Sequence, residues 1–176
     1  MKTRYVDLIE QTFDFPKDEF KLDDDQLVWN DLPLVELLEK HGTPLRISYL
    51  PKIGEKIEIA RDCFAKAFAT HNYSGSYEYF YCTKSNHFHY VIDKVLDKGV
   101  NLETSSAYDL EMIELLIERG RITKDATILC NGFKDERYIK GIGKLANRGF
   151  NVIPIIDNMA EIYHLDEVIE GHCDIG

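Results

Sequence analysis

Hydrophobic residues in the second half of the chain alternate between short continuous runs and stripes with helical spacing. The runs are rich in strand-forming residues and are bounded by turn residues, a pattern that predicts β-strands. The four predicted strands cover residues 77–83, 100–104, 126–130 and 152–156. Each strand is followed by apolar residues three or four positions apart, which predict one buried face of a helix. The four stripes lie within residues 88–96, 110–117, 138–145 and 162–169.

Boundary signals support four consecutive strand–helix units. A glycine just past each stripe can take the left-handed conformation that ends a helix. These glycines are Gly99, Gly120, Gly149 and Gly171. Ser106 and Asn158 are predicted N-caps, because an acidic residue three positions later favours the start of a helix. Strands joined by helices run parallel, so the predicted fold class is α/β with parallel strand–helix repeats.

The stretch before these units is less regular. Residues 45–50 alternate and predict a further strand, and apolar positions from Ile53 to Phe68 predict a helix. Residues 1–43 are predicted to form an acidic lead-in with one short helix, although a partly disordered terminus is the alternative for residues 1–30. We therefore expect two segments, the lead-in at 1–43 and the repeats at 44–176.

Two architectures are compatible with four such units. One is a small open doubly wound sheet, and the other is the first half of a TIM-like (β/α)8 barrel, since a closed barrel needs about 250 residues. The last four residues, 173–176, have the pattern of an opening fifth strand. In both architectures ligands bind at the carboxyl ends of the parallel strands.

Charge and cysteine usage narrow the possible functions. The 176 residues carry 21 Lys and Arg against 31 Asp and Glu, a net charge of −10. Such a surface repels phosphate backbones unless it has a local basic stripe, and the basic residues are scattered, so no nucleic-acid partner is expected. The sequence contains no run of 18 consecutive apolar residues, so no membrane span is predicted. The four cysteines lack Cys-x-x-Cys spacing, which argues against a zinc site, and a reducing cytoplasm is the expected location.

Polar residues at the predicted strand ends are the candidate catalytic and binding residues. Lys84 follows an aromatic strand, where partial desolvation would depress the lysine pKa and free its amine for Schiff-base formation. On spacing alone, a solvated lysine that ends a strand is the favoured interpretation. Glu103 ends the second strand and could bind a cation or orient a ring. Gly141-x-Gly143 lies inside a helical stripe, so it is no dinucleotide loop.

Three motifs in order resemble one enzyme family. Residues 81–86, Tyr-Cys-Thr-Lys-Ser-Asn, resemble the Tyr-x-x-Lys-x-Asn motif of fold-type III pyridoxal-phosphate enzymes, the alanine-racemase-like barrels that decarboxylate basic amino acids. Residues 99–106 are similar to the second-strand segment of that family. Residues 130–135, Cys-Asn-Gly-Phe-Lys-Asp, are similar to a stretch of biosynthetic arginine decarboxylases. The resemblance covers about residues 42–176.

The resemblance implies a role for each candidate residue. It makes Lys84 the catalytic residue that binds pyridoxal 5'-phosphate as a Schiff base, and places Glu103 near cofactor and substrate. It implies decarboxylation of arginine to agmatine in polyamine biosynthesis by a homodimer or higher oligomer, and Mg²⁺ is a further cofactor that the family suggests. The chain would be the N-terminal part of the barrel, truncated before strand five. In relatives the phosphate loop and ring-nitrogen partner come later, so this chain alone is expected to be inactive.

Other readings remain open at this point. A related enzyme could decarboxylate ornithine, diaminopimelate or carboxynorspermidine instead of arginine. A regulatory or interaction protein could keep the same scaffold without the cofactor. A small flavodoxin-like binding domain would fit the repeats, although the sequence carries no recognisable phosphate loop.

Overall fold

The chain folds into two units. In the computed structural model, which describes residues 19–24 and 26–176, unit one is Met1–Ser48 and unit two is Tyr49–Gly176. The predicted division fell between residues 43 and 44. The alternative of a partly disordered terminus concerns residues that lie mostly outside the described part.

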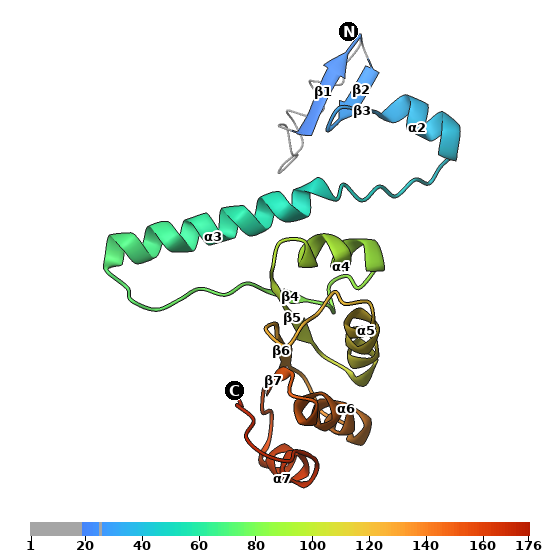
Figure 1. Ribbon diagram of the computed structural model, residues 1–176. Coiled ribbons are helices and arrows are strands. Elements are labelled where there is room, and N and C mark those ends of the chain that lie inside the picture. Colours follow the sequence, from blue (N-terminus) through green and yellow to red (C-terminus); the bar gives the residue numbers. More distant parts are fainter. Residues whose placement is uncertain (1–18, 25) are drawn as a thin grey trace. The chain divides into compact units, whose positions relative to one another are not determined.

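Unit one contains a small antiparallel sheet that the sequence analysis missed. Its strands pair in the order β1-β2-β3, and α2 follows directly (Figure 1). The elements are β1 (Phe20–Asp23), β2 (Gln26–Trp29), β3 (Leu32–Pro33) and α2 (Leu34–His41). Asn30 and Asp31 join β2 to β3 with φ angles of 47° and 63°, the geometry of a two-residue hairpin turn. The short helix predicted within residues 1–43 corresponds to α2.

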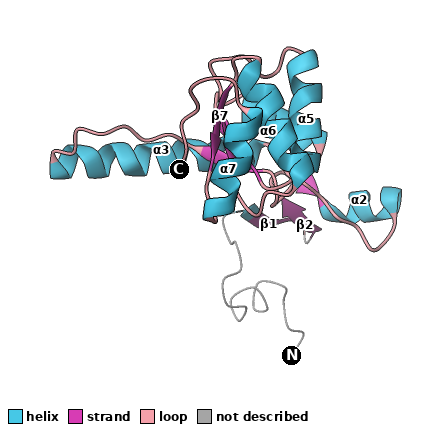
Figure 2. Ribbon diagram, turned by 90° about the horizontal axis from the view of Figure 1, so that it is seen from below, coloured by secondary structure: helices cyan, strands magenta, loops and turns pink. Residues whose placement is uncertain are grey.

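Unit two confirms the four strand–helix repeats. Its parallel sheet has the order β4-β5-β6-β7, and helices α4 to α7 lie along one face of it (Figure 1). The strands are β4 (Phe80–Cys82), β5 (Asn101–Thr104), β6 (Thr127–Cys130) and β7 (Asn151–Pro154). The helices are α4 (His89–Leu96), α5 (Ala107–Glu118), α6 (Glu136–Asn147) and α7 (Met159–Val168), with α3 (Pro51–His71) before the sheet (Figure 2). Each predicted strand differs from the observed strand by a few residues at one or both ends.

The strand predicted at residues 45–50 is wrong. This segment has no strand assignment and joins no sheet within the described residues. A β-strand is held by hydrogen bonds to a neighbouring strand, so an alternating sequence without such a neighbour stays irregular. The helix predicted from Ile53 to Phe68 is confirmed as the longer α3, Pro51–His71.

Side chains alternate across the sheet and divide it into two faces. Leu102, Ile128 and Val152 face the helices and are buried in the core. The opposite face, here the open face, carries the residues that follow them in each strand. These are Glu103, Leu129 and Ile153, and Cys82 of β4 lies on the same face beside Glu103; all four are partly exposed. The hydrophobic core therefore lies between the sheet and α4 to α7.

Hydrogen bonds at the helix starts confirm the predicted caps. The Ser106 hydroxyl accepts from the backbone N–H of Asp109, and the Asn158 side chain accepts from the N–H groups of Ala160 and Glu161. Asp135 caps α6 in the same way without having been predicted. At the other end of the chain, Gly176 N–H donates to the Pro154 carbonyl at 3.0 Å and Ile156 N–H donates to the Gly176 carbonyl at 2.8 Å. These two bonds have the pattern of a parallel ladder beside β7.

The two glycines of Gly141-x-Gly143 permit close helix packing. A Cβ atom on Gly141 would lie 2.8 Å from Cδ1 of Leu110 in α5. A Cβ atom on Gly143 would lie 2.8 Å from both Cγ2 and the carbonyl oxygen of Val168 in α7. The motif is thus explained by the approach of α5 and α7 to α6, and its exclusion as a phosphate loop is consistent with this packing.

Alanine at these two glycines should have different effects. Gly143→Ala meets a backbone carbonyl that cannot move aside, so we expect a net loss of about 1–2 kcal/mol despite the better helix propensity of alanine. Gly141→Ala meets only the end of the flexible Leu110 side chain. We expect it to lie within about 0.5 kcal/mol of the parent, because strain and the gain in helix propensity nearly cancel. Urea unfolding of both variants measures the difference, and equal losses would refute this account of the packing.

Candidate active site at the carboxyl edge of the sheet

Backbone hydrogen bonds extend the ladder beyond the assigned strand ends. Thr83 N–H donates to the Glu103 carbonyl, Asn131 N–H to the Thr104 carbonyl and Ile155 N–H to the Cys130 carbonyl, each at 2.9 Å. The segments that follow β4, β6 and β7 are therefore held side by side at one edge. This is the edge where parallel α/β folds bind ligands.

Lys84 lies in a tight turn immediately beyond β4. The turn is closed by Ser85, whose N–H and hydroxyl both donate to the Cys82 carbonyl, at 3.2 and 2.8 Å. The Tyr81 hydroxyl donates to the Asn86 carbonyl at 2.9 Å and fixes the next residues. Lys84 itself is exposed. Across residues 19–24 and 26–176 its ammonium has no hydrogen-bond or ion-pair partner, so a well-anchored turn presents an available amine.

The partial desolvation expected for Lys84 remains a prediction, and the side chain is exposed in the described chain. The neighbouring aromatic rings of Tyr79 and Tyr81 pack against the hydrophobic core. The Tyr81 hydroxyl still reaches the carboxyl edge, where it donates to the Asn86 carbonyl. The sequence correctly placed Lys84 at a strand end but could not show which way the adjacent rings turn.

Glu103 lies on the open face and is held by one amide. The Nδ2 atom of Asn131 donates to Oε1 of Glu103 at 3.1 Å. The Oδ1 atom of the same amide accepts from the Gly132 N–H at 2.8 Å. Both polar ends of the Asn131 side chain are therefore used, and the Glu103 carboxylate has a defined orientation. Sequence reasoning named Glu103 as a strand-end residue but did not pair it with Asn131.

Beneath this edge, hydroxyl and thiol groups face the helices. The Thr104 and Tyr138 hydroxyls form a hydrogen bond of 2.8 Å, and Thr104 also donates to the Leu129 carbonyl at 3.1 Å. Burial raises the pKa of the Cys130 thiol to about 11. This thiol therefore stays protonated near neutral pH and is no nucleophile.

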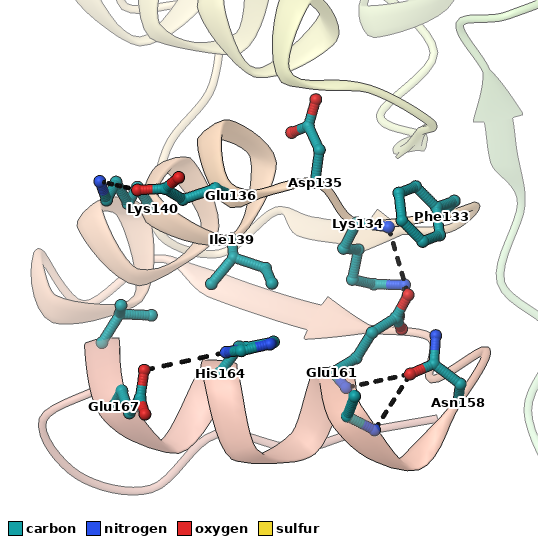
Figure 3. A pocket seen from close by; sticks show the side chains of 12 residues that line it. Phe133, Lys134, Asp135, Glu136, Ile139, Lys140, Asn158, Glu161, His164 and Glu167 are labelled. Atoms are coloured by element: carbon teal, nitrogen blue, oxygen red, sulfur yellow. Dashed lines mark hydrogen bonds and ion pairs between the residues drawn. The ribbon is translucent and has the colours of Figure 1, made fainter.

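A buried ion pair joins the loop that follows β6 to the first turn of α7. The Nζ atom of Lys134 lies 3.1 Å from Oε2 of Glu161, and the two residues are only 3% and 2% exposed. Figure 3 shows the Lys134 side chain pointing toward the Glu161 carboxylate. Sequence reasoning named Lys134 only within the third motif and Glu161 only as a capping acid. Because the two residues lie far apart in the sequence, local sequence patterns could not show that they form a pair.

Glu161 should make stability fall in acid. Burial by itself raises the pKa of this carboxyl, but the backbone N–H groups of Asp157 and Lys134, together with the Lys134 ammonium, outweigh burial and hold the pKa below its ordinary value. A lowered folded-state pKa stabilises the fold above the unfolded-state pKa, and this stability is lost as pH falls through the folded-state value.

Urea unfolding between about pH 7 and pH 3 measures this dependence. We expect the parent to lose stability more steeply with acid than Glu161→Gln, which lacks the titrating carboxyl. Glu167→Gln removes an exposed carboxyl from the same helix and is the matched control. An equally steep acid loss in parent and Glu161→Gln would contradict the assignment.

A cavity of about 590 Å³ lies beside the pair, between α6 and α7 (Figure 3). Its lining includes Lys134, Glu161, Ile139 and His164. Neither Lys84 nor Glu103 lines it, so it is separate from the edge where the candidate residues lie.

Neither a cluster of metal ligands nor a membrane span is found within residues 19–24 and 26–176. There, no group of three or more His, Cys, Asp or Glu side chains could hold a metal ion. The Mg²⁺ that the resemblance implies therefore gains no support from such a group among these residues. None of the helices described is long and apolar enough to cross a membrane.

Curated proteins similar in sequence carry one recurrent name. "Biosynthetic arginine decarboxylase 2" of Synechocystis is 32% identical over 146 residues, which cover 74% of this chain and 22% of that protein. The biosynthetic arginine decarboxylase of Prochlorococcus marinus strain MIT 9215 is 29% identical, with 73% of this chain and 20% of that protein covered. The chain thus spans about a fifth of the length of these relatives. No protein-family model matches it.

Solved structures show where the fold recurs. The biosynthetic arginine decarboxylase of Campylobacter jejuni superposes with a TM-score of 0.70 at 23% identity, over 93% of this chain and 30% of that one. The diaminopimelate decarboxylase of M. jannaschi gives 0.63 at 22% identity, over 86% and 32%. Both have the TIM-type barrel, and four parallel strand–helix units are consistent with part of it. The chain is therefore a homologue of a segment of the biosynthetic arginine decarboxylases, and it shares the fold of the fold-type III pyridoxal-phosphate decarboxylases.

Proposed function

We propose that this chain supplies the lysine side of a pyridoxal-phosphate-dependent decarboxylase site, with Lys84 as the cofactor-binding lysine. The observation that carries the proposal is the exposed amine of Lys84, which has no partner among the described residues, in an anchored turn at the carboxyl edge of a parallel sheet. The sequence similarity to biosynthetic arginine decarboxylases supports the same assignment.

The residues present suit an aldehyde cofactor. A Schiff base needs a primary amine that is not held in an ion pair, and Lys84 meets this requirement within the described chain. Glu103 and Asn131 add a carboxylate and an amide at the same edge, already hydrogen-bonded to each other at 3.1 Å. Polar groups in fixed positions are what a site needs to orient a ring and a substrate.

Each residue has a distinct task in the proposed reaction. When bound, pyridoxal phosphate supplies an electron sink for the pair released as the bond between Cα and the carboxylate breaks. Lys84 holds the cofactor and, once its amine is released, can carry a proton at Nζ. Glu103 accepts hydrogen bonds on the open face and orients the groups that donate them. Asn131 keeps that carboxylate from rotating.

Arginine is the substrate we propose, with agmatine and carbon dioxide as products and polyamine synthesis as the use. The names of the sequence relatives favour arginine, and the net charge of −10 favours encounter with a cationic amino acid. We further propose that the complete protein works in the cytoplasm as a homodimer or higher oligomer. The fold shared with a diaminopimelate decarboxylase makes diaminopimelate the second candidate. Decarboxylation assays with both amino acids on the longer protein would separate the two.

Reductive trapping tests the cofactor assignment on this chain. The protein is mixed with pyridoxal phosphate and reduced with borohydride, and the added pyridoxyl group is located by peptide mass. We expect one dominant label, on Lys84. Labels spread evenly over exposed lysines such as Lys56 and Lys66 would show that this chain makes no site by itself, and would move the test to a longer protein.

A further inference from the structure

We infer that Lys134 and Glu161 are positioning residues, whose buried ion pair fixes the Asn131 amide and, through it, the carboxylate of Glu103. The inference rests on the proposed function, because the orientation of Glu103 matters only if the carboxyl edge binds cofactor and substrate. Neither Lys134 nor Glu161 is placed in contact with either molecule.

Every polar atom of the pair has a defined partner. The Lys134 ammonium donates to Glu161 at 3.1 Å, to the Gly132 carbonyl at 2.9 Å and to the Ile155 carbonyl. The Glu161 carboxylate also accepts the N–H groups of Lys134 and Asp157, at 3.2 and 3.0 Å. These bonds tie the segment after β6 to the segment after β7. The pair is therefore saturated and has a single arrangement.

The ammonium controls the backbone directly after Asn131. Gly132 has a φ of +77°, a left-handed conformation that glycine adopts without strain, and its carbonyl is held by Lys134. A Cβ atom at this position would also lie 3.4 Å from the Ser105 carbonyl oxygen. The ammonium thus fixes the Gly132 carbonyl, and the close Ser105 carbonyl leaves little room for a larger residue at this position.

Gly132 in turn fixes the Asn131 side chain at the carboxyl edge. Its N–H donates to Oδ1 of Asn131 at 2.8 Å, which turns Nδ2 of the same amide toward Glu103 at 3.1 Å. One continuous set of hydrogen bonds therefore runs from Glu161 in α7, through Lys134, Gly132 and Asn131, to the open face. The amide cannot rotate without breaking one of these bonds.

A contact that only held α6 and α7 together would not need two charged side chains. Burying two charges carries a desolvation cost, and apolar side chains of similar volume often stabilise a core equally well. Here the two charged groups instead use their extra donors and acceptors on four backbone groups around the carboxyl edge. Fixing a loop in one conformation is what such a saturated pair can do and an apolar contact cannot.

Hydrogen exchange of the Asn131 side-chain amide, followed by NMR on the cofactor-free protein, tests the inference. We expect slow exchange in the parent and exchange at least about tenfold faster in Glu161→Gln, the factor for losing one hydrogen bond to a charged group. Glu167→Gln on the exposed side of α7 is the matched control and should exchange as the parent does. Unchanged exchange in a folded Glu161→Gln would overturn the inference.

If Glu161→Gln fails to fold, measurements on the parent protein alone still test the inference. The exposed side chain of Asn72 provides the reference for an amide without protection. Asn131 exchanging as fast as Asn72 would overturn the inference, whereas slow exchange that becomes intermediate in the conservative variant Glu161→Asp would support it.

This test is independent of the cofactor proposal. If borohydride trapping fails at Lys84 but Asn131 still responds to Glu161→Gln, the positioning pair stands, and the proposal that this chain by itself binds the cofactor at Lys84 falls. If Lys84 is labelled and Asn131 does not respond, the reverse holds.

Discussion

Lys84→Ala should reduce the trapped pyridoxyl label to the background of the other lysines, which is the largest functional effect we expect. The variant removes the one amine that the turn at Cys82–Ser85 presents at the carboxyl edge. The fold should be unaffected, because the Lys84 side chain is exposed and makes no hydrogen bond or ion pair within the described residues. Peptide mass after borohydride reduction measures the result.

Two further variants separate chemistry from charge. Lys84→Arg keeps the positive charge but lacks a primary amine that forms a stable Schiff base, so it should lose the label as completely as Lys84→Ala. Lys56→Ala removes an exposed lysine of α3 and should keep the label on Lys84. A dominant label that persists after Lys84→Ala would refute the assignment.

Glu161→Ala should destabilise unit two by about 3–5 kcal/mol, the largest loss of stability expected from a single substitution here. It leaves the Lys134 ammonium buried beside a vacated volume and removes the acceptor for two backbone N–H groups. A buried charge without its partner costs far more than an exposed one, because water cannot replace the missing carboxylate.

Glu167→Ala supplies the comparison within the same helix. Its carboxyl is exposed, 3.8 Å from His164, and its removal should cost no more than about 0.5 kcal/mol. Urea unfolding of parent and both variants at neutral pH measures the two losses. Equal losses for Glu161→Ala and Glu167→Ala would mean that the ion pair is not energetically coupled to the fold.

The repeating units could be predicted because each one satisfies several local rules at once. A strand-forming run, a helical stripe and a capping residue coincide in the unit from β5 to α5, where Ser106 caps the helix as expected. The strand expected at 45–50 failed, since alternation says nothing about whether a neighbouring strand exists. The hairpin of unit one was missed although Asn30-Asp31 is a recognisable turn pair.

The candidate site was predictable only in part. Strand ends located Lys84 and Glu103 at the carboxyl edge, since topology alone brings parallel strand ends together. The sequence did not show that the rings beside Lys84 pack against the core, because ring orientation depends on which face of the strand is buried. The Lys134–Glu161 pair joins residues 27 positions apart, and nothing in local periodicity shows that two such side chains meet inside the protein.

The strand order β4-β5-β6-β7 has a consequence for how the chain is made. Synthesis proceeds from the amino terminus, and every strand after β4 pairs with the one that left the ribosome just before it. Each new strand is separated from its partner by a single helix, so the loop-closure entropy lost when the two strands pair is small. No strand depends on a partner that is distant in the sequence. Unit two can thus assemble progressively during translation, adding one strand and one helix at a time to a surface that already exists.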